Sequence, residues 1–145
     1  MLSTGLTDPG GMCVDPKKTT AVWITDRTAA ADVLHLVQPG ALPPPAWRWP
    51  DRPGVAGCTA SDGRIAVAET GATALATLEA DEKGLFTGPP QPSLQKVYGR
   101  LGAAARGPDG LTWLGTLNKA GGTPTSSDDR VIRIQVSGGG GSSRS

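Results

Sequence analysis

The chain contains few side chains that could carry out acid–base or nucleophilic catalysis. His35 is its single histidine, and it lies within residues 33–37, VLHLV, a run of mostly apolar residues. A histidine in such a run is more typical of a packed or surface structural residue than of a general base. The sequence also has no Gly-x-Ser-x-Gly motif, so nothing supports a hydrolase with a nucleophile elbow and a catalytic triad.

The two cysteines, Cys13 and Cys58, have no cysteine or histidine neighbour at the spacing of metal ligands. Each follows apolar or small residues in a predicted strand, so we predict buried free thiols. A disulfide between the two is the alternative, but nothing in the sequence predicts it.

Three similar stretches of sequence predict the strands that would position a functional site in this chain. Each is a turn followed by a short strand of alternating pattern: DPKKTTAVWIT, SDGRIAVAET and GPDGLTWLGT. Aligning them places Trp23, Val67 and Trp113 at equivalent positions, about 45 residues apart. Short strands separated by Asp-Gly, Pro-Gly or Gly-Gly turns at this period are typical of β-propeller blades.

We therefore predict an all-β fold, a partial β-propeller of about three four-stranded antiparallel blades. The predicted propeller covers residues 1–136, with blades at about 5–48, 49–96 and 97–136, and a disordered Gly/Ser-rich tail covers 137–145. A short amphipathic helix is the alternative for residues 29–37. The tryptophans are interpreted as structural, with Trp23 and Trp113 between blades and Trp47 and Trp49 on an outer edge strand.

Charge and hydropathy exclude some partners. The chain has 14 basic and 13 acidic side chains, a formal net charge of +1, so its total charge supports neither nucleic-acid nor anionic-membrane binding. No apolar run approaches the roughly 18 residues of a membrane-spanning helix. The opening MLSTGLTDPGG has no basic and apolar regions of a signal peptide. Propellers have roughly four to eight blades, so we expect a second propeller half, self-association or an open arc.

Five sequence elements occur in order near the end of the chain: Gly99-Arg100-Leu101-Gly102, Pro108-Asp109-Gly110, Trp113, Thr116-Leu117-Asn118 and Asp128-Asp129-Arg130-Val131-Ile132-Arg133. They resemble the last blade of the glucose/sorbosone dehydrogenase family, soluble quinoprotein sugar dehydrogenases built as six-bladed β-propellers. Residues 7–41 and the WRWPDRPG segment at 47–54 are similar to earlier blades of that family. The resemblance implies that the chain corresponds to the C-terminal half of such a propeller.

The resemblance also implies a chemistry. These enzymes oxidise a sugar at its anomeric carbon, using pyrroloquinoline quinone, calcium and a general-base histidine. Arg100 matches an arginine that contacts the carboxylates of the cofactor, and the backbone carbonyls of Gly11 and Met12 match the calcium-binding segment. Members of the family are typically secreted or periplasmic, but the sequence itself assigns no compartment.

Several positions depart from the family pattern. Gly10 replaces a glutamine, Asp26 and Val33 replace glutamates, and Gly102 replaces the second arginine of the last blade. His35 occupies an asparagine position, and the base histidine of the family belongs to the N-terminal half. We interpret the run at 128–130 as the end of a solvated loop. The prediction is therefore a sugar-dehydrogenase-like half that is inactive alone, and the alternative is a non-catalytic binding or scaffold propeller module without a cofactor.

Overall fold

The computed structural model describes residues 3–37 and 39–135, and every regular element among them is a β-strand. None of the described residues forms an apolar helix long enough to cross a bilayer. Thirteen strands follow one another along the chain: β1 Ser3–Thr4, β2 Pro9–Asp15, β3 Lys18–Arg27, β4 Asp32–Val37, β5 Gly40–Ala41, β6 Trp47–Trp49, β7 Val55–Ser61, β8 Arg64–Glu69, β9 Ala74–Glu79, β10 Gln91–Ser93, β11 Leu101–Arg106, β12 Thr112–Thr116 and β13 Val131–Ile134.

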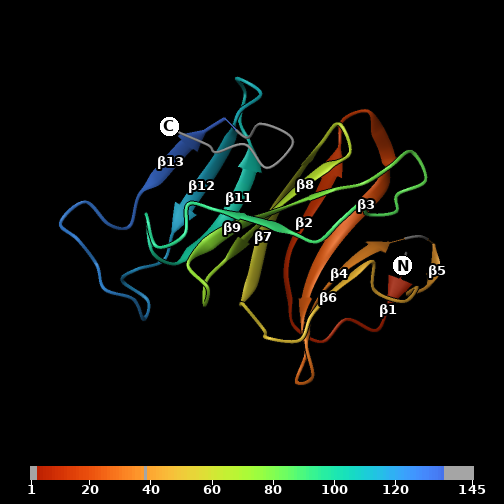
Figure 1. The fold of residues 1–145 in the computed structure, drawn as a ribbon, viewed down its shortest axis with the longest axis horizontal. Helices are drawn as coiled ribbons and strands as arrows, with labels where there is room; N and C mark the ends of the chain where they lie inside the picture. The colour runs from red at the N-terminus through yellow and green to blue at the C-terminus, as the bar shows by residue number, and fades with distance from the viewer. Residues whose placement is uncertain (1–2, 38, 136–145) are drawn as a thin grey trace.

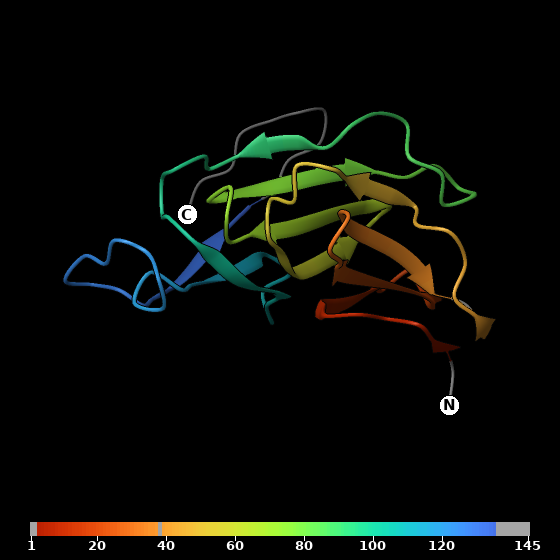
Figure 2. The same ribbon diagram turned by 90° about the horizontal axis from the view of Figure 1, so that it is seen from below.

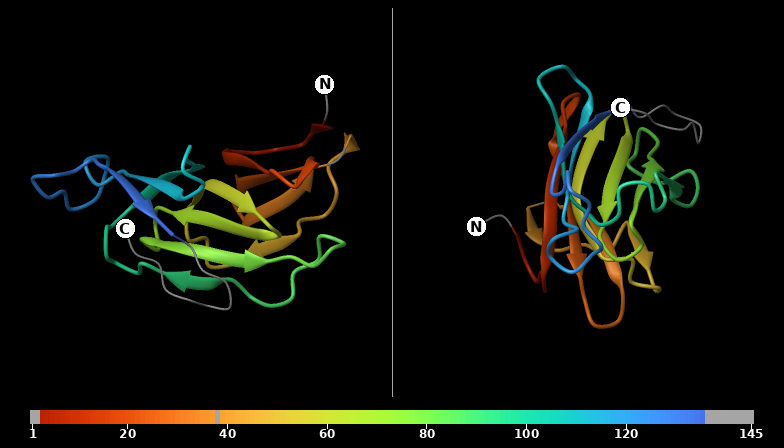
Figure 3. Two further views of the ribbon diagram at one scale, coloured as in Figure 1. Left: turned by 90° about the horizontal axis from the view of Figure 1, so that it is seen from above. Right: turned by 90° about the vertical axis from the view of Figure 1, so that its left-hand side faces the viewer.

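The strands form three antiparallel sheets that lie side by side in chain order (Figure 1). The first sheet has the order β2-β3-β4-β6, the second β7-β8-β9-β10 and the third β11-β12-β13. A short parallel pair joins β1 to β5. The second sheet lies between the other two, and the sheets spread like a fan that does not close (Figure 3). The all-β, partial-propeller fold class is therefore confirmed.

Some details of the predicted fold are confirmed and others are not. Residues 32–37 form strand β4, not a helix, and β6 is the edge strand predicted for Trp47 and Trp49. The third sheet has three strands among the described residues where four were expected. The predicted tail at 137–145 and the last residue of the third predicted blade lie outside the described residues. The exact blade boundaries stay a prediction.

Three strands, β2, β7 and β11, form the inner edge of the fan, and we call them the inner strands. Strand β7 packs against both β2 and β11, while β10 lies on the side away from them (Figure 2). Glycine allows this close approach, because a Cβ at Gly11 would lie 2.6 Å from the Cα of Gly57. A Cβ at Gly57 would lie 2.5 Å from the backbone nitrogen of Ala104. Gly11 and Gly57 therefore allow the inner strands of neighbouring sheets to pack backbone against backbone.

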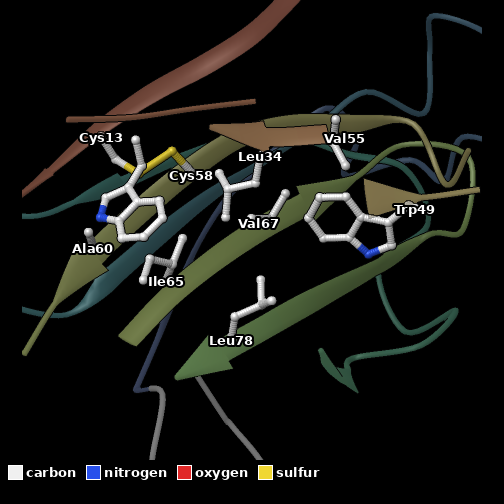
Figure 4. Close-up of a cluster of buried hydrophobic side chains, with 10 residues drawn as sticks. Cys13, Leu34, Trp49, Val55, Cys58, Ala60, Ile65, Val67 and Leu78 are labelled. Atoms are coloured by element: carbon white, nitrogen blue, oxygen red, sulfur yellow. A yellow bond between two sulfur atoms is a disulfide. The ribbon is translucent and has the colours of Figure 1, made fainter. Parts of the chain in front are cut away.

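Two apolar clusters fill the spaces between the sheets. The larger one lies between the first and second sheets and contains Trp23, Leu34, Trp49, Val67 and Leu78, with the disulfide at one end and Trp49 at the other (Figure 4). The smaller one lies between the second and third sheets and contains Ala66, Ala68, Leu75, Leu101, Leu114, Ile132 and Ile134. Burial of these apolar surfaces is the main stabilising contribution that joins the sheets.

The repeat alignment needs a correction of one residue. Trp23 faces the second sheet, whereas Val67 faces back toward the first, because both belong to the cluster between them. Ala68 faces the third sheet and lies midway between Trp23 and Trp113 in sequence. Side chains alternate between the faces of a strand, so a slip of one residue exchanges the faces. Trp113 faces away from the second sheet and is half-buried, so its predicted packing between two blades is not formed among the described residues.

The prediction of free thiols is wrong. Cys13 of β2 and Cys58 of β7 form a disulfide, with their Cα atoms 5.7 Å apart. The two cysteines are 45 positions apart, which is the period of the repeat. This separation places them at nearly equivalent heights on adjacent inner strands, whose facing side chains are close enough to be bridged. The cross-link thus joins the first sheet directly to the second.

Candidate functional site

The loops around the third sheet converge on the side chain of Asn118. Its Nδ2 donates to the carbonyl of Tyr98 (2.7 Å) and to Oδ2 of Asp128 (3.1 Å), and its Oδ1 accepts from the backbone N–H of Arg100 (2.9 Å). The backbone N–H of Asn118 donates to Oδ1 of Asp129 (2.7 Å). We call this set of residues the Asn118 network. It joins three of the motif elements that carry the family resemblance.

Asp128 is the buried anchor of this network. Its carboxylate accepts from the N–H of Thr125 (2.9 Å) and the hydroxyl of Thr116 (3.2 Å), and its side chain is fully buried. The hydrogen bond from Thr125 lowers the pKa of Asp128, with further contributions from Asn118 and Thr116. The interpretation of this run as a solvated loop end is therefore wrong for Asp128, because the carboxylate turns inward to bind the loop that precedes it.

The Asn118 network positions Arg100, which directly precedes the inner strand β11. The Arg100 side chain lies along Gly121 and Gly122, where an added Cβ on Gly122 would be 3.0 Å from the Arg100 Cδ. Its Nε is buried and has no hydrogen-bond partner among the described residues. A buried guanidinium N–H without an acceptor is costly unless an acceptor binds there. This is the observation that fits a carboxylate ligand at Arg100.

Replacing Asn118 with alanine is expected to lower the free energy of unfolding by about 2–3 kcal/mol. The variant leaves the buried Asp128 carboxylate, the N–H of Arg100 and the carbonyl of Tyr98 short of partners. Urea unfolding at pH 7 measures the effect. Lys119→Ala, at the exposed neighbouring position, is the matched control and should change stability by less than about 0.5 kcal/mol. Equal stability of the two variants would contradict the role of the network.

The other predicted site residues, Gly11 and Met12, lie in the inner strand β2. The Gly11 carbonyl has a long contact from the Thr25 hydroxyl (3.5 Å), and the Met12 side chain is 68% exposed. Strand β7 contacts both β2 and β11, so Gly11 and Met12 lie in one outer member of the three inner strands and Arg100 lies next to the start of the other. Calcium ligation by the Gly11 and Met12 carbonyls stays a prediction.

The remaining polar candidates have structural roles. His35 is packed and pairs with Ile24, so it projects away from the second sheet, and burial lowers its pKa. Asp26 accepts from the backbone N–H groups of Thr7 and Asp8, and Asp32 accepts from those of Gly54 and Val55. Both carboxylates are thus committed to anchoring loops. No group of three His, Cys, Asp or Glu side chains in the described part of the chain is placed to bind a metal ion.

Glu69 is a buried carboxyl that sequence reasoning missed. It ends strand β8, faces the first sheet like Val67, and is 5% exposed. Burial raises its pKa to about 7, and the negative charges of Asp51 and Asp32 add to this effect. The only sequence signal was a glutamate at the end of an otherwise apolar strand, and such a residue is usually a solvated strand end.

Folding stability should decrease as the pH rises through the range set by Glu69. The unfolded carboxyl ionises near its ordinary pKa of 4.5, whereas the folded one stays protonated to about 7. The unfolded state therefore binds fewer protons, and the free energy of unfolding falls by about 2–3 kcal/mol between about pH 4.5 and 7.5. Glu69→Gln should remove this decrease in urea titrations at several pH values, while the exposed Glu82→Gln should retain it. Identical pH profiles for the two variants would refute the assignment.

Comparison with solved structures finds sugar dehydrogenases of the same fold. The chain superposes on the PQQ-bound aldose sugar dehydrogenase of Streptomyces coelicolor with a TM-score of 0.80 and 22% identity, covering 92% of this chain and 44% of that one. It superposes on a putative oxidoreductase (glucose dehydrogenase) of Thermus thermophilus with a TM-score of 0.81 and 26% identity, covering 92% and 46%. For the apo form of the soluble aldose sugar dehydrogenase of Escherichia coli, the TM-score is 0.67, the identity 18%, and the coverage 80% and 43%.

These similarities confirm the resemblance to the fold of sugar dehydrogenases. The chain spans less than half the length of each of these solved relatives. No protein-family model matches the sequence, and no curated protein matches it either.

Proposed function

We propose that this chain forms the C-terminal half of a PQQ-dependent sugar dehydrogenase-like β-propeller and has no dehydrogenase activity alone. The observation that carries the proposal is the superposition of three consecutive sheets on sugar dehydrogenases over 92% of this chain and 44–46% of theirs. Assignment to the C-terminal half is supported by the motif elements of the third sheet, which meet in the Asn118 network.

Arg100 is the residue of this chain that fits the cofactor. When bound, pyrroloquinoline quinone would supply the two-electron acceptor for oxidation of a sugar. The Arg100 guanidinium would bind one of its carboxylates, because Nε is buried and lacks an acceptor. The Asn118 network fixes the backbone of Arg100, and the loop at Gly121 and Gly122 holds its stem. The guanidinium would therefore be oriented before the ligand arrives.

The rest of a catalytic centre does not fit within the described residues. Calcium takes six to eight oxygen ligands, and the carbonyls of Gly11 and Met12 would be two of them. The carboxylates of Asp26, which stands where the family has a glutamate, and of Asp32 are committed to backbone N–H groups. The only histidine, His35, points away from the second sheet. The general base and most calcium ligands would therefore come from another half of the ring.

The two end faces of the fan are where such a half would pack. The outer face of the first sheet exposes Met12 and Val14, which are 68% and 40% accessible, and that of the third exposes Val131, 71% accessible. Propeller sheets are stabilised when neighbours cover both faces. A second copy of this chain or a separate N-terminal half would supply the neighbouring sheets that cover the two end faces. The Cys13–Cys58 disulfide supports an oxidising compartment for the protein.

Reconstitution tests the proposal. The purified chain is mixed with calcium and pyrroloquinoline quinone, and dye reduction is measured with a panel of aldoses. No turnover is expected, whereas equilibrium dialysis should detect quinone binding that Arg100→Ala weakens and Arg106→Ala does not. Robust turnover by this chain alone would contradict the inactivity. Absence of quinone binding would favour the alternative, a binding or scaffold propeller module that has lost its cofactor.

A further inference from the structure

A groove separates the outer strands of the first and second sheets, and nothing in the proposed function uses it. It encloses about 380 Å³. Trp47 and Trp49 of β6 line one wall, and Ala74, Ala76 and Pro92 of β9 and β10 line the other. The groove exists because small alanine side chains face large tryptophan side chains at this level of the two sheets. Glu69 also belongs to its lining.

The Glu69 carboxyl is the unusual feature of this groove. Glu69 is only 5% exposed, and no hydrogen bond or ion pair to its carboxyl is seen among the described residues. Its carboxyl oxygens are not among the completely buried atoms that lack a partner, so they keep a small accessible surface in the groove. Buried carboxyls are normally paired or hydrogen-bonded, since an unpaired one is costly. A bound ligand that pairs with the Glu69 carboxyl would remove this free-energy cost.

The charges around Glu69 determine which charge such a ligand should carry. Asp51, in the segment between β6 and β7, and Asp32 of β4 act on it with the same negative sign. Arg48 belongs to the groove lining, but it alternates with Trp47 and Trp49, so its side chain projects from the opposite face of β6. No cation of the described residues therefore neutralises Glu69. A ligand with a positive charge would be attracted here, and a neutral or anionic one would not.

The walls select the shape of the ligand. Aromatic and proline side chains favour an aliphatic stem, and the indole of a tryptophan attracts a cation near its face. The absence of three metal-ligating side chains in the described part of the chain disfavours a metal ion. We propose that this groove binds an alkylammonium group, with Glu69 as its counter-ion and Trp47 and Trp49 as its apolar wall.

Titration of the full chain with n-butylammonium chloride at pH 8 tests the proposal. Binding is followed by isothermal calorimetry and by the tryptophan indole N–H signals in NMR spectra. Saturable binding is expected for n-butylammonium, and binding at least about tenfold weaker for 1-butanol, which has the same stem without the charge. Methyl glucoside, as a neutral sugar, should not compete. Equal binding of 1-butanol, or displacement by methyl glucoside, would overturn the proposal.

Two variants locate the site. Glu69→Gln should weaken n-butylammonium binding by about tenfold or more, while Glu82→Gln, exposed and outside the groove, should leave it unchanged. Glu69→Gln is expected to fold, because it removes a buried charge and keeps the shape of the side chain. Binding to the unchanged chain should also weaken as the pH falls below about 7, where Glu69 takes up a proton. Retained binding by folded Glu69→Gln would refute the assignment, whatever the outcome of quinone reconstitution.

Discussion

Replacing both Cys13 and Cys58 with alanine is expected to lower the free energy of unfolding by about 4 kcal/mol. The two residues close a loop with a sequence separation of 45. The chain-entropy relation for cross-links gives about 3 kcal/mol for a loop of about 15 residues and about 4.7 kcal/mol for about 100 residues, so this loop falls between them. The loss should appear in urea unfolding at neutral pH under non-reducing conditions.

The disulfide lies where its loss would weaken the packing of the first sheet against the second. It links β2 to β7, so it fixes the first sheet against the second at the level of the larger apolar cluster (Figure 4). The unchanged chain treated with dithiothreitol is the control, because reduction removes the cross-link while keeping both sulfur atoms. It should approach the stability of the double alanine variant. If reduction and substitution both left the midpoint of unfolding unchanged, the disulfide would have no stabilising role.

The period of the sequence was enough to predict the sheets but not the faces of their strands. The Pro-Gly pairs at 9–10 and 53–54 and the Pro-Asp-Gly turn at 108–110 mark the blade pattern, although Pro9 and Gly10 begin strand β2, and alternating apolar runs mark the central strands. Aligning Val67 with Trp23 was wrong by one position, because Val67 lies 44 residues after Trp23 and 46 before Trp113, whereas an even spacing of 45 leads to Ala68. The residue that faces the next sheet is Ala68, a small side chain that Leu114 and Ile132 pack against. Residue size is a weak guide to which face of a strand a side chain occupies, because a small side chain in one blade can be matched by larger ones in the next.

The sequence predicted a site residue only where the residue type itself indicates a function, as an arginine indicates carboxylate binding. Arg100 was identified from a motif, and the structure adds the unpartnered Nε that fits a carboxylate. Asn118 appeared in the same motif without a role, because its function is to join three loops that are distant in sequence. Glu69 could not be predicted, since its unusual burial comes from the first sheet packing over the end of β8. Disulfide formation depended on the same tertiary contact between consecutive sheets.

Replacing Gly57 with valine is expected to destabilise the protein by at least about 4 kcal/mol, enough to unfold a chain of ordinary stability. Gly57 is confined from both sides. The Cβ that Gly11 would carry lies 2.6 Å from the Gly57 Cα, and the Cβ that Gly57 would carry lies 2.5 Å from the Ala104 nitrogen and 3.1 Å from the Ala103 Cα. These neighbours are backbone atoms, which cannot rotate away as a side chain can. Strand β11 would have to move away from β7, which would open the smaller apolar cluster between the second and third sheets.

Gly88 provides the matched control for this prediction. No atom lies within 4 Å of a Cβ added at Gly88, so Gly88→Val should change the free energy of unfolding by less than about 0.5 kcal/mol. Gly57→Ala should fall between the two valine variants, because its single Cβ meets the same backbone atoms without the two further methyl groups. Thermal unfolding followed by circular dichroism ranks the three variants. A Gly57→Val protein as stable as Gly88→Val would show that β11 can move away from β7 at little cost, and the close approach of these two strands would then not contribute to the stability of the fold.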